Sequence, residues 1–183
     1  MIRIPLALAP LAVLPLAAAC GAPDVAGEAD ASVEDAGETV ALPDAGIAPE
    51  EAAALEAQVA ALYDDPFAVD TLNPPLPMTE ELAALFAAER AAAEANEGLA
   101  PNLDFAWHVD GQDAEITELA ITHEQIAPGL VAVIARFENF GEPRTVRYVW
   151  AQQGADWRLA DIVIGEAEDA MTVTLSESLS VER

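Results

Sequence analysis

The densest cluster of chemically capable side chains lies on one short polar stretch, which contains Asp104, His108, Asp110, Gln112 and Asp113. Carboxylates beside an imidazole could transfer protons as general acid and base, or could bind a cation. The same residue types also satisfy backbone amides in structural turns. The spacing does not match an EF-hand loop, which needs alternating acids before its Gly and a Glu at its end. We favour the structural turn and keep all five residues as candidate binding residues.

The other histidine, His123, alternates with Leu119 and Ile121 in a segment that reads as a strand. This position predicts a core or rim histidine rather than a ligand. The chain has no GxSxG motif, and no serine is marked as a partner of His108, so nothing completes a nucleophilic triad. Covalent hydrolysis is therefore disfavoured, and we expect neither a metal nor a cofactor.

Four of the seven basic residues gather on the later strands: Arg136, Arg144, Arg147 and Arg158. In one interpretation they pair with acids across neighbouring strands. Those acids are Glu138, Glu142, Asp156 and Asp161. In the other, one or two of them, with Arg144 and Arg147 as candidates, hold a carboxylate or phosphate of a small ligand. Arg90 lies within helical reach of Glu89 and Glu94, and we expect a solvent-exposed pair there.

Large aromatic side chains could line a ligand pocket or fill the core. They are Trp107, Tyr148, Trp150 and Trp157. In a domain of this size such residues are more often core. We therefore expect Trp150 to be buried against the second helix, and keep it as a candidate binding residue for the case in which its sheet face is an interface.

The N-terminal residues have the pattern of a removable export signal. Arg3 precedes an apolar run, and residues 17–19 are small. That run is too short to span a bilayer comfortably. The small residues before Cys20 and Gly21 resemble the lipobox of bacterial lipoproteins, although Ala17 stands where Leu is most usual.

The lipobox resemblance implies cleavage after residue 19 and lipidation of Cys20, with several acyl chains, palmitate among them, that give lasting membrane attachment. Cys20 is the only cysteine, so no intramolecular disulfide can form. Gly21 is not an Asp retention signal, and we therefore expect the outer membrane, facing the periplasm. The alternative is an ordinary signal peptide in which Cys20 is incidental.

The chain is strongly acidic, with 33 Asp and Glu, 7 basic residues that are all arginine, and a formal net charge of -26. Nucleic acids and anionic lipid surfaces would repel it, because both bind basic patches. Residues 20–48 are rich in Ala, Gly, Pro, Asp and Glu and contain no aromatic residue or base. We expect this segment to be a disordered acidic tether between the signal, residues 1–19, and one folded domain, residues 49–183.

The periodicity of the folded part predicts helices followed by strands. Pro49 suits the first turn of a helix that ends near Tyr63, and Thr79 is a good N-cap for a second helix that ends near Asn96. Four segments rich in Val, Ile and aromatics follow, separated by short turns. They are 115–124, 130–140, 145–153 and 157–164. Hairpin-length turns predict an antiparallel meander, and the whole predicts an α+β domain.

Neither face of the predicted sheet is cleanly polar. One face must meet the two helices, and we expect a partner subunit in a homodimer, the C-terminal tail or a loop to cover the other. Residues 171–175 in that tail fit either a short strand or a helical turn, and the sequence does not decide between them.

The order of elements, together with several sequence stretches, resembles the DUF3828 family of bacterial envelope proteins. The matching stretches are residues 82–93, 103–105, 109–113, 135–144 and 157–162, within a region of roughly 52–165. One departure is Ala106-Trp107-His108, where the family pattern has Asp-Pro-Phe. The resemblance implies a small NTF2-like domain, in which two N-terminal helices pack on a curved antiparallel sheet to form a cone with a pocket. It implies no activity.

Two functions remain open at this point. The first is a non-catalytic envelope module that binds an envelope protein or a small ligand. The second is an NTF2-like pocket enzyme that uses Asp113 or Asp161 as general base on a small molecule. A buried carboxylate among Tyr148 and Trp150 would favour the enzyme, whereas a filled cone would favour the binder.

Overall fold

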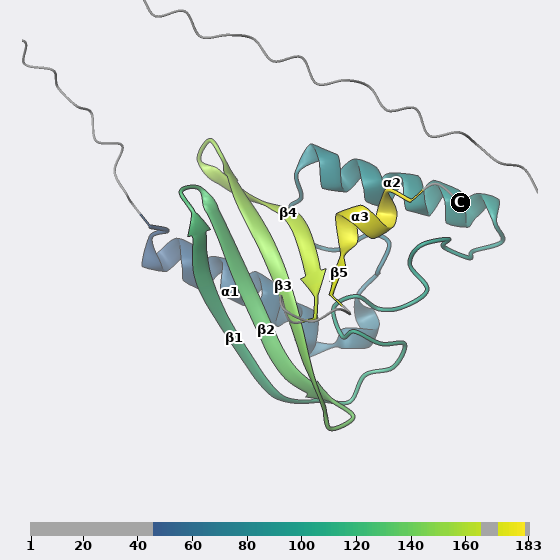
Figure 1. Cartoon of the computed structure of the whole chain (residues 1–183), viewed down its shortest axis with the longest axis horizontal. Helices are drawn as coiled ribbons and strands as arrows, with labels where there is room; N and C mark the ends of the chain where they lie inside the picture. Colours follow the sequence, from purple (N-terminus) through teal and green to yellow (C-terminus); the bar gives the residue numbers. More distant parts are fainter. Residues whose placement is uncertain (1–45, 166–171, 182–183) are drawn as a thin grey trace, which may run out of the picture. The chain divides into compact units, whose positions relative to one another are not determined.

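The computed structural model describes residues 46–165 and 172–181 (Figure 1). In chain order the elements are α1 (Pro49–Asp64), the short 3₁₀ helix η1 (Pro66–Ala68), α2 (Glu80–Ala95), β1 (Ile116–Ala127), β2 (Leu130–Asn139), β3 (Glu142–Gln153), β4 (Asp156–Ile164), β5 (Val173–Thr174) and α3 (Leu175–Leu179). The predicted signal, Cys20 and the predicted tether as far as residue 45 lie outside the described residues.

Both long helices begin where local chemistry predicts. Pro49 occupies the first turn of α1, and Glu51 reaches back so that its Oε2 accepts from the Ala48 amide at 3.4 Å. The side chain of Thr79 caps α2 by accepting from the Leu82 amide at 3.3 Å. The predicted positions of both helices are therefore confirmed.

The sheet is an antiparallel meander in the order β1-β2-β3-β4-β5. Each of the first three hairpins turns at or beside a glycine with positive φ: Gly129, Gly141 and Gly154. Strand β3 begins at Glu142, earlier than the predicted Thr145, and so contains Pro143. Proline is tolerated there because β4 pairs with β3 only from Val146 onward, which leaves that end of β3 at a free edge. The α+β class and the antiparallel sheet are confirmed.

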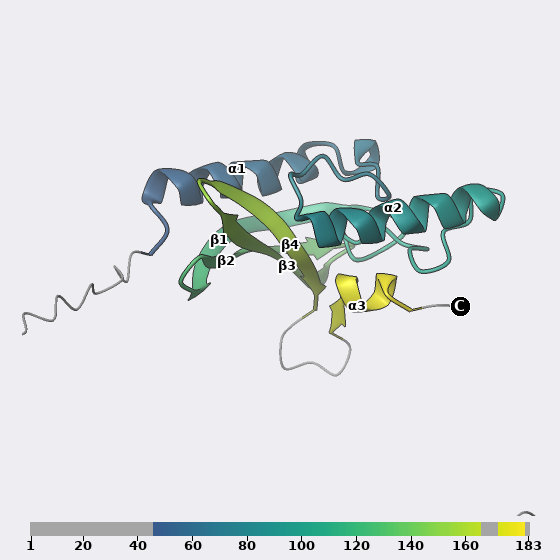
Figure 2. The same ribbon diagram turned by 90° about the horizontal axis from the view of Figure 1, so that it is seen from above.

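One side of the sheet carries the core. Val133, Tyr148 and Ile162 stand opposite one another on β2, β3 and β4, and all three are fully buried. Helix α1 contacts β1 and β2, while α2 contacts β4. Figure 2 shows α1 lying along the curved sheet. We call this face the helix-facing side.

The C-terminal tail forms both of the structures that its sequence left open. Val173 and Thr174 pair with the end of β4, and the chain then turns directly into α3. Leu175 at the start of α3 is fully buried in the core cluster, and α3 contacts both α2 and β4. The tail therefore extends the sheet by one short strand and closes the core at that end.

Candidate functional site

The connection between α2 and β1 contains all five residues of the predicted polar cluster, but the structure separates them. His108 is buried, Asp110 is half-buried, and Asp104, Gln112 and Asp113 are exposed. They do not form one constellation of facing side chains. The loop instead has a buried structural half and an exposed half.

His108 anchors the buried half. Its Nε2 donates to the carbonyl oxygen of Pro66 at 3.0 Å, and its own carbonyl accepts from the Tyr63 hydroxyl at 2.8 Å. Burial lowers the pKa of His108, an effect that the Pro66 carbonyl partly opposes. Nδ1 has no hydrogen-bond partner among the described residues. These contacts describe a neutral histidine that joins η1 to the loop.

Two tyrosines complete this buried polar group. The hydroxyls of Tyr63 on α1 and Tyr148 on β3 lie 3.1 Å apart, and both side chains are buried. Burial raises the pKa of each phenol, for Tyr148 with a further rise from its neighbour Tyr63. Both groups stay protonated at neutral pH, so they act as hydrogen-bonding links between helix and sheet.

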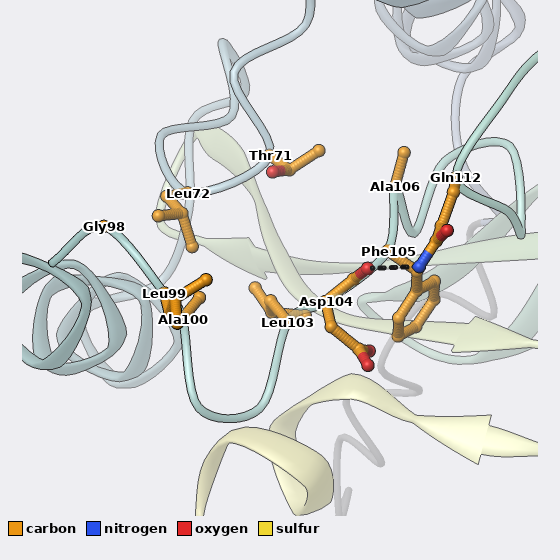
Figure 3. A pocket seen from close by; sticks show the side chains of 10 residues that line it. All are labelled: Thr71, Leu72, Gly98, Leu99, Ala100, Leu103, Asp104, Phe105, Ala106 and Gln112. Atoms are coloured by element: carbon orange, nitrogen blue, oxygen red, sulfur yellow. Dashed lines mark hydrogen bonds between the residues drawn. The ribbon is translucent and has the colours of Figure 1, made fainter. Parts of the chain in front are cut away.

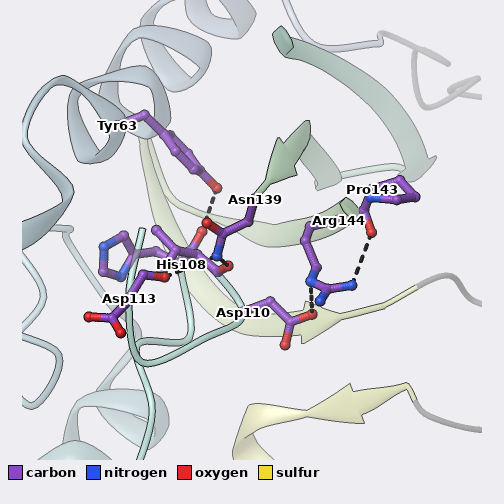
Figure 4. Close-up of polar contacts among 8 residues, drawn as sticks. Tyr63, His108, Asp110, Asp113, Asn139, Pro143 and Arg144 are labelled. Atoms are coloured by element: carbon purple, nitrogen blue, oxygen red, sulfur yellow. Dashed lines mark hydrogen bonds and ion pairs between the residues drawn. The ribbon is translucent and has the colours of Figure 1, made fainter. Parts of the chain in front are cut away.

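Asn139, which the sequence analysis did not single out, holds the loop to the end of β2 (Figure 4). Its Nδ2 donates to the carbonyls of Val109 and Asp113, each at 3.1 Å, and its Oδ1 accepts from the Glu115 amide at 2.9 Å. All three hydrogen bonds of this buried side-chain amide are to backbone groups of the loop. An Asn before Phe-Gly reads as an ordinary turn residue, so the sequence held no signal for this role.

Asp110 and Arg144 form an ion pair at the rim, with Nε 3.4 Å from Oδ2 and each side chain 35% exposed. Asp110 also adopts a left-handed backbone conformation, with φ of 50°. Exposed ion pairs of this kind contribute about 0.2 to 1 kcal/mol. The pair closes the turn that we favoured, and it occupies the Arg144 guanidinium that a ligand anion would need.

The remaining sheet arginines also have protein partners. Arg147 binds Glu124 at 2.6 Å and Arg158 binds Asp156 at 3.2 Å, while Arg136 donates to the Thr122 hydroxyl at 3.5 Å. Arg158 pairs with one of the expected acids, Asp156, but within β4 rather than across neighbouring strands. For Arg144 and Arg147 the predicted partner acids were wrong. Arg144 pairs with Asp110 in the loop before β1, and Arg147 pairs with Glu124 on β1, because the fold and not closeness in sequence decides which side chains meet.

The expected solvent-exposed pair on α2 was wrong. Glu89 is buried and accepts from the amides of Asn102 and Leu103, while Arg90 donates to the Leu72 carbonyl at 2.7 Å. Both side chains face connecting segments that pack over the helix. The backbone groups of those segments need hydrogen-bond partners when they are buried, and Glu89 and Arg90 supply them. His123 does lie at the rim of the helix-facing side, where it is 39% exposed and its Nδ1 is 2.8 Å from Glu56 Oε1.

The large aromatics fill the space between helices and sheet. Trp107, Tyr148 and Trp150 are each 0% exposed, and Trp157 is half-buried. The Trp107 ring lies between Phe86 of α2 and Tyr148 of β3, at centroid distances of 6.5 and 6.2 Å. Trp150 is thus a core residue in this structure, as expected, and a ligand at the surface would not touch it.

The exposed half of the loop borders a groove with a volume of about 530 Å³ (Figure 3). Asp104 and Gln112 are the candidate residues that line it, and Gln112 Nε2 donates to the Asp104 carbonyl at 3.3 Å. The other lining residues are Thr71, Leu72, Gly98, Leu99, Ala100, Leu103, Phe105 and Ala106. The sequence analysis named two of the polar lining residues but missed Thr71 and the apolar walls, which come from two separate connections.

Comparisons with protein-family models, with curated proteins and with solved structures find no match for this chain. Within residues 46–165 and 172–181, no three His, Cys, Asp or Glu side chains lie in an arrangement that could hold a metal ion. In the same residues no helix combines the length and the apolar character that crossing a membrane requires.

Proposed function

We propose that this protein is a bacterial envelope lipoprotein, anchored through lipidated Cys20, whose folded domain is a non-catalytic binding module. The observation that carries the proposal is the filled interior: Trp107, Tyr148 and Trp150 are fully buried in the core cluster between helices and sheet. A domain filled in this way binds through its surface.

The two carboxylates considered as general bases support the same conclusion. Asp161 accepts from the Ile162 and Ser176 amides and from the Ser176 hydroxyl, so its oxygens are engaged in joining β4 to α3. Asp113 is exposed and does not line the groove. The pocket-enzyme alternative named these two acids as its general base, and neither lies in a pocket of the described chain.

The proposed fold relationship is to NTF2-like domains of the DUF3828 kind. Two helices and a curved antiparallel sheet agree with what that resemblance implies, and the closed interior is a departure from an open cone. Since NTF2-like folds host binders and enzymes alike, the fold supports no activity by itself.

Anchoring and binding fit together geometrically in this proposal. The described chain starts beside the end of β1, where the Ile47 amide donates to Gln125 Oε1 at 3.0 Å. If the part of the predicted tether that precedes the described chain, residues 20–45, is flexible, its span is roughly 30 Å, enough to hold the domain clear of the outer membrane in the periplasm. Strong acidity makes a basic partner or ligand the best complement and argues against nucleic acid.

The test is recovery of the lipidated protein from membranes under native conditions, followed by native mass spectrometry and by crosslinking. The proposal expects a bound molecule or a specific crosslinked envelope protein. Phe67→Ser, which removes an exposed apolar side chain outside the groove, is the control, and it should leave the bound molecule or crosslinked protein unchanged. Recovery of the protein alone in every preparation, or turnover of a small molecule from the envelope, would contradict it.

A further inference from the structure

The groove beside Asp104 has the size of a small-molecule site. Its volume of about 530 Å³ lies within the usual range for ligand pockets. One wall comes from Thr71 and Leu72 in the connection between η1 and α2, and the other from residues 98–106 after α2. Figure 3 shows these two segments facing each other, with Gln112 at one end.

The walls are held in place by hydrogen bonds from behind. The Trp107 indole donates to the Thr71 carbonyl at 2.9 Å, and Arg90 donates to the Leu72 carbonyl at 2.7 Å. On the opposite wall the buried Glu89 accepts from the Leu103 amide at 3.0 Å. A groove whose backbone is already fixed loses less conformational entropy when a ligand enters.

The surface of the groove is mostly apolar. Leu99 is 68% exposed, and Leu72 and Phe105 are half-buried beside the same hollow. Removing exposed apolar surface from water lowers the free energy. A ligand for this groove therefore needs an apolar body.

Only one of the ten lining residues is ionisable, and it is Asp104. Its side chain is exposed, and Glu97 and Asp113 stand next to lining residues in the sequence. Arg90 is not a lining residue and is engaged with the Leu72 carbonyl. The charge at this groove thus complements a cation.

We propose that the groove binds a small organic cation, consisting of an apolar body that covers Leu99 and Phe105 and an ammonium or guanidinium group that pairs with Asp104. This inference rests on the proposed binding function and gives it a ligand class. Gln112 and the Thr71 hydroxyl supply further polar contacts at the two sides of the groove.

The experiment uses three probes with similar apolar bodies and different charge: 2-phenylethylammonium, 3-phenylpropionate and 2-phenylethanol. The lipidated full-length protein is held in zwitterionic nanodiscs, with empty nanodiscs as the blank. Binding is followed by NMR through the amide shifts of Ala100 and Ala106, which line the groove. The ammonium probe is expected to bind most tightly and the carboxylate probe most weakly.

Three variants identify the charge that matters. Asp104→Asn should weaken the ammonium probe by up to about fivefold, the upper end for an exposed ion pair, and leave the alcohol unchanged. Asp104→Arg should reverse the order, so that the carboxylate binds better than the ammonium. Asp113→Asn removes the same charge from the same loop at a residue that does not line the groove, and should have a smaller effect.

Any of three results would overturn the inference. They are equal binding of the three probes, equal effects of Asp104→Asn and Asp113→Asn, and no shift at Ala100 and Ala106 with any probe. Failure here is distinguishable from failure of the proposed function. If Asp104→Arg still carries its bound molecule or crosslinked partner out of the membrane, the module binds elsewhere and only the groove assignment falls.

Discussion

His108 donates from Nε2 to the carbonyl oxygen of Pro66 at 3.0 Å, and this bond joins the chain after α1 to the loop before β1. The neutral ring is needed for the arrangement, because a proton on the buried Nδ1 would find no acceptor among the described residues. This candidate binding residue is therefore structural.

A lowered pKa of His108 makes stability depend on pH. The unfolded chain binds this proton near the ordinary histidine pKa of about 6.5, and the folded chain binds it only at lower pH. The stabilisation is thus complete above that value and is lost as the pH falls below it. His108→Gln keeps a donor for Pro66 and removes the titration, so the stability difference between wild type and variant should shrink from pH 7 to pH 5 in urea unfolding. A difference that is constant with pH would contradict the structural assignment.

Trp150→Ala should destabilise the domain by about 3 to 5 kcal/mol, as expected for truncating a large buried aromatic. Phe67→Ala changes a residue that is 72% exposed and should alter stability by less than about 0.5 kcal/mol. Urea unfolding of both variants gives the comparison. A fully stable Trp150→Ala would mean that this face of the sheet is an interface and that the core assignment is wrong.

Asn139→Ala should cost about 1 to 3 kcal/mol, because it leaves the buried Val109 carbonyl, and the part-buried Asp113 carbonyl and Glu115 amide, without their partner. Hydrogen exchange adds a local readout, since the Glu115 amide should exchange faster in the variant. Glu142→Gln, at the exposed start of β3, is the control. If the Glu115 amide keeps its protection in Asn139→Ala, the loop is held by other contacts.

Helix starts and the meander were predictable because their signals are local. Thr79 caps α2 through a residue only three positions away, and hairpin turns are marked by glycine. The tail was ambiguous because Val173 and Thr174 become a strand only by pairing with β4.

The candidate site was less predictable than the fold, because long-range packing decides which polar residues are buried. Composition alone could not distinguish His108, which packs under η1, from Asp104, which faces solvent four residues earlier. The same reason explains why Glu89 was read as a surface acid, and why the groove walls at Leu72 and Leu99 were missed. These segments lie far apart in sequence and meet only in the folded chain.

The most direct measurement of the central claim is labelled-palmitate incorporation in a bacterial host with the lipoprotein pathway. We expect the wild-type protein to take up label, to be processed and to sediment with membranes. Cys20→Ser should take up none and remain unprocessed, with the folded domain unchanged because Cys20 lies outside it. A wild-type protein that is exported yet carries no label would contradict the claim that this binding module is anchored at the membrane.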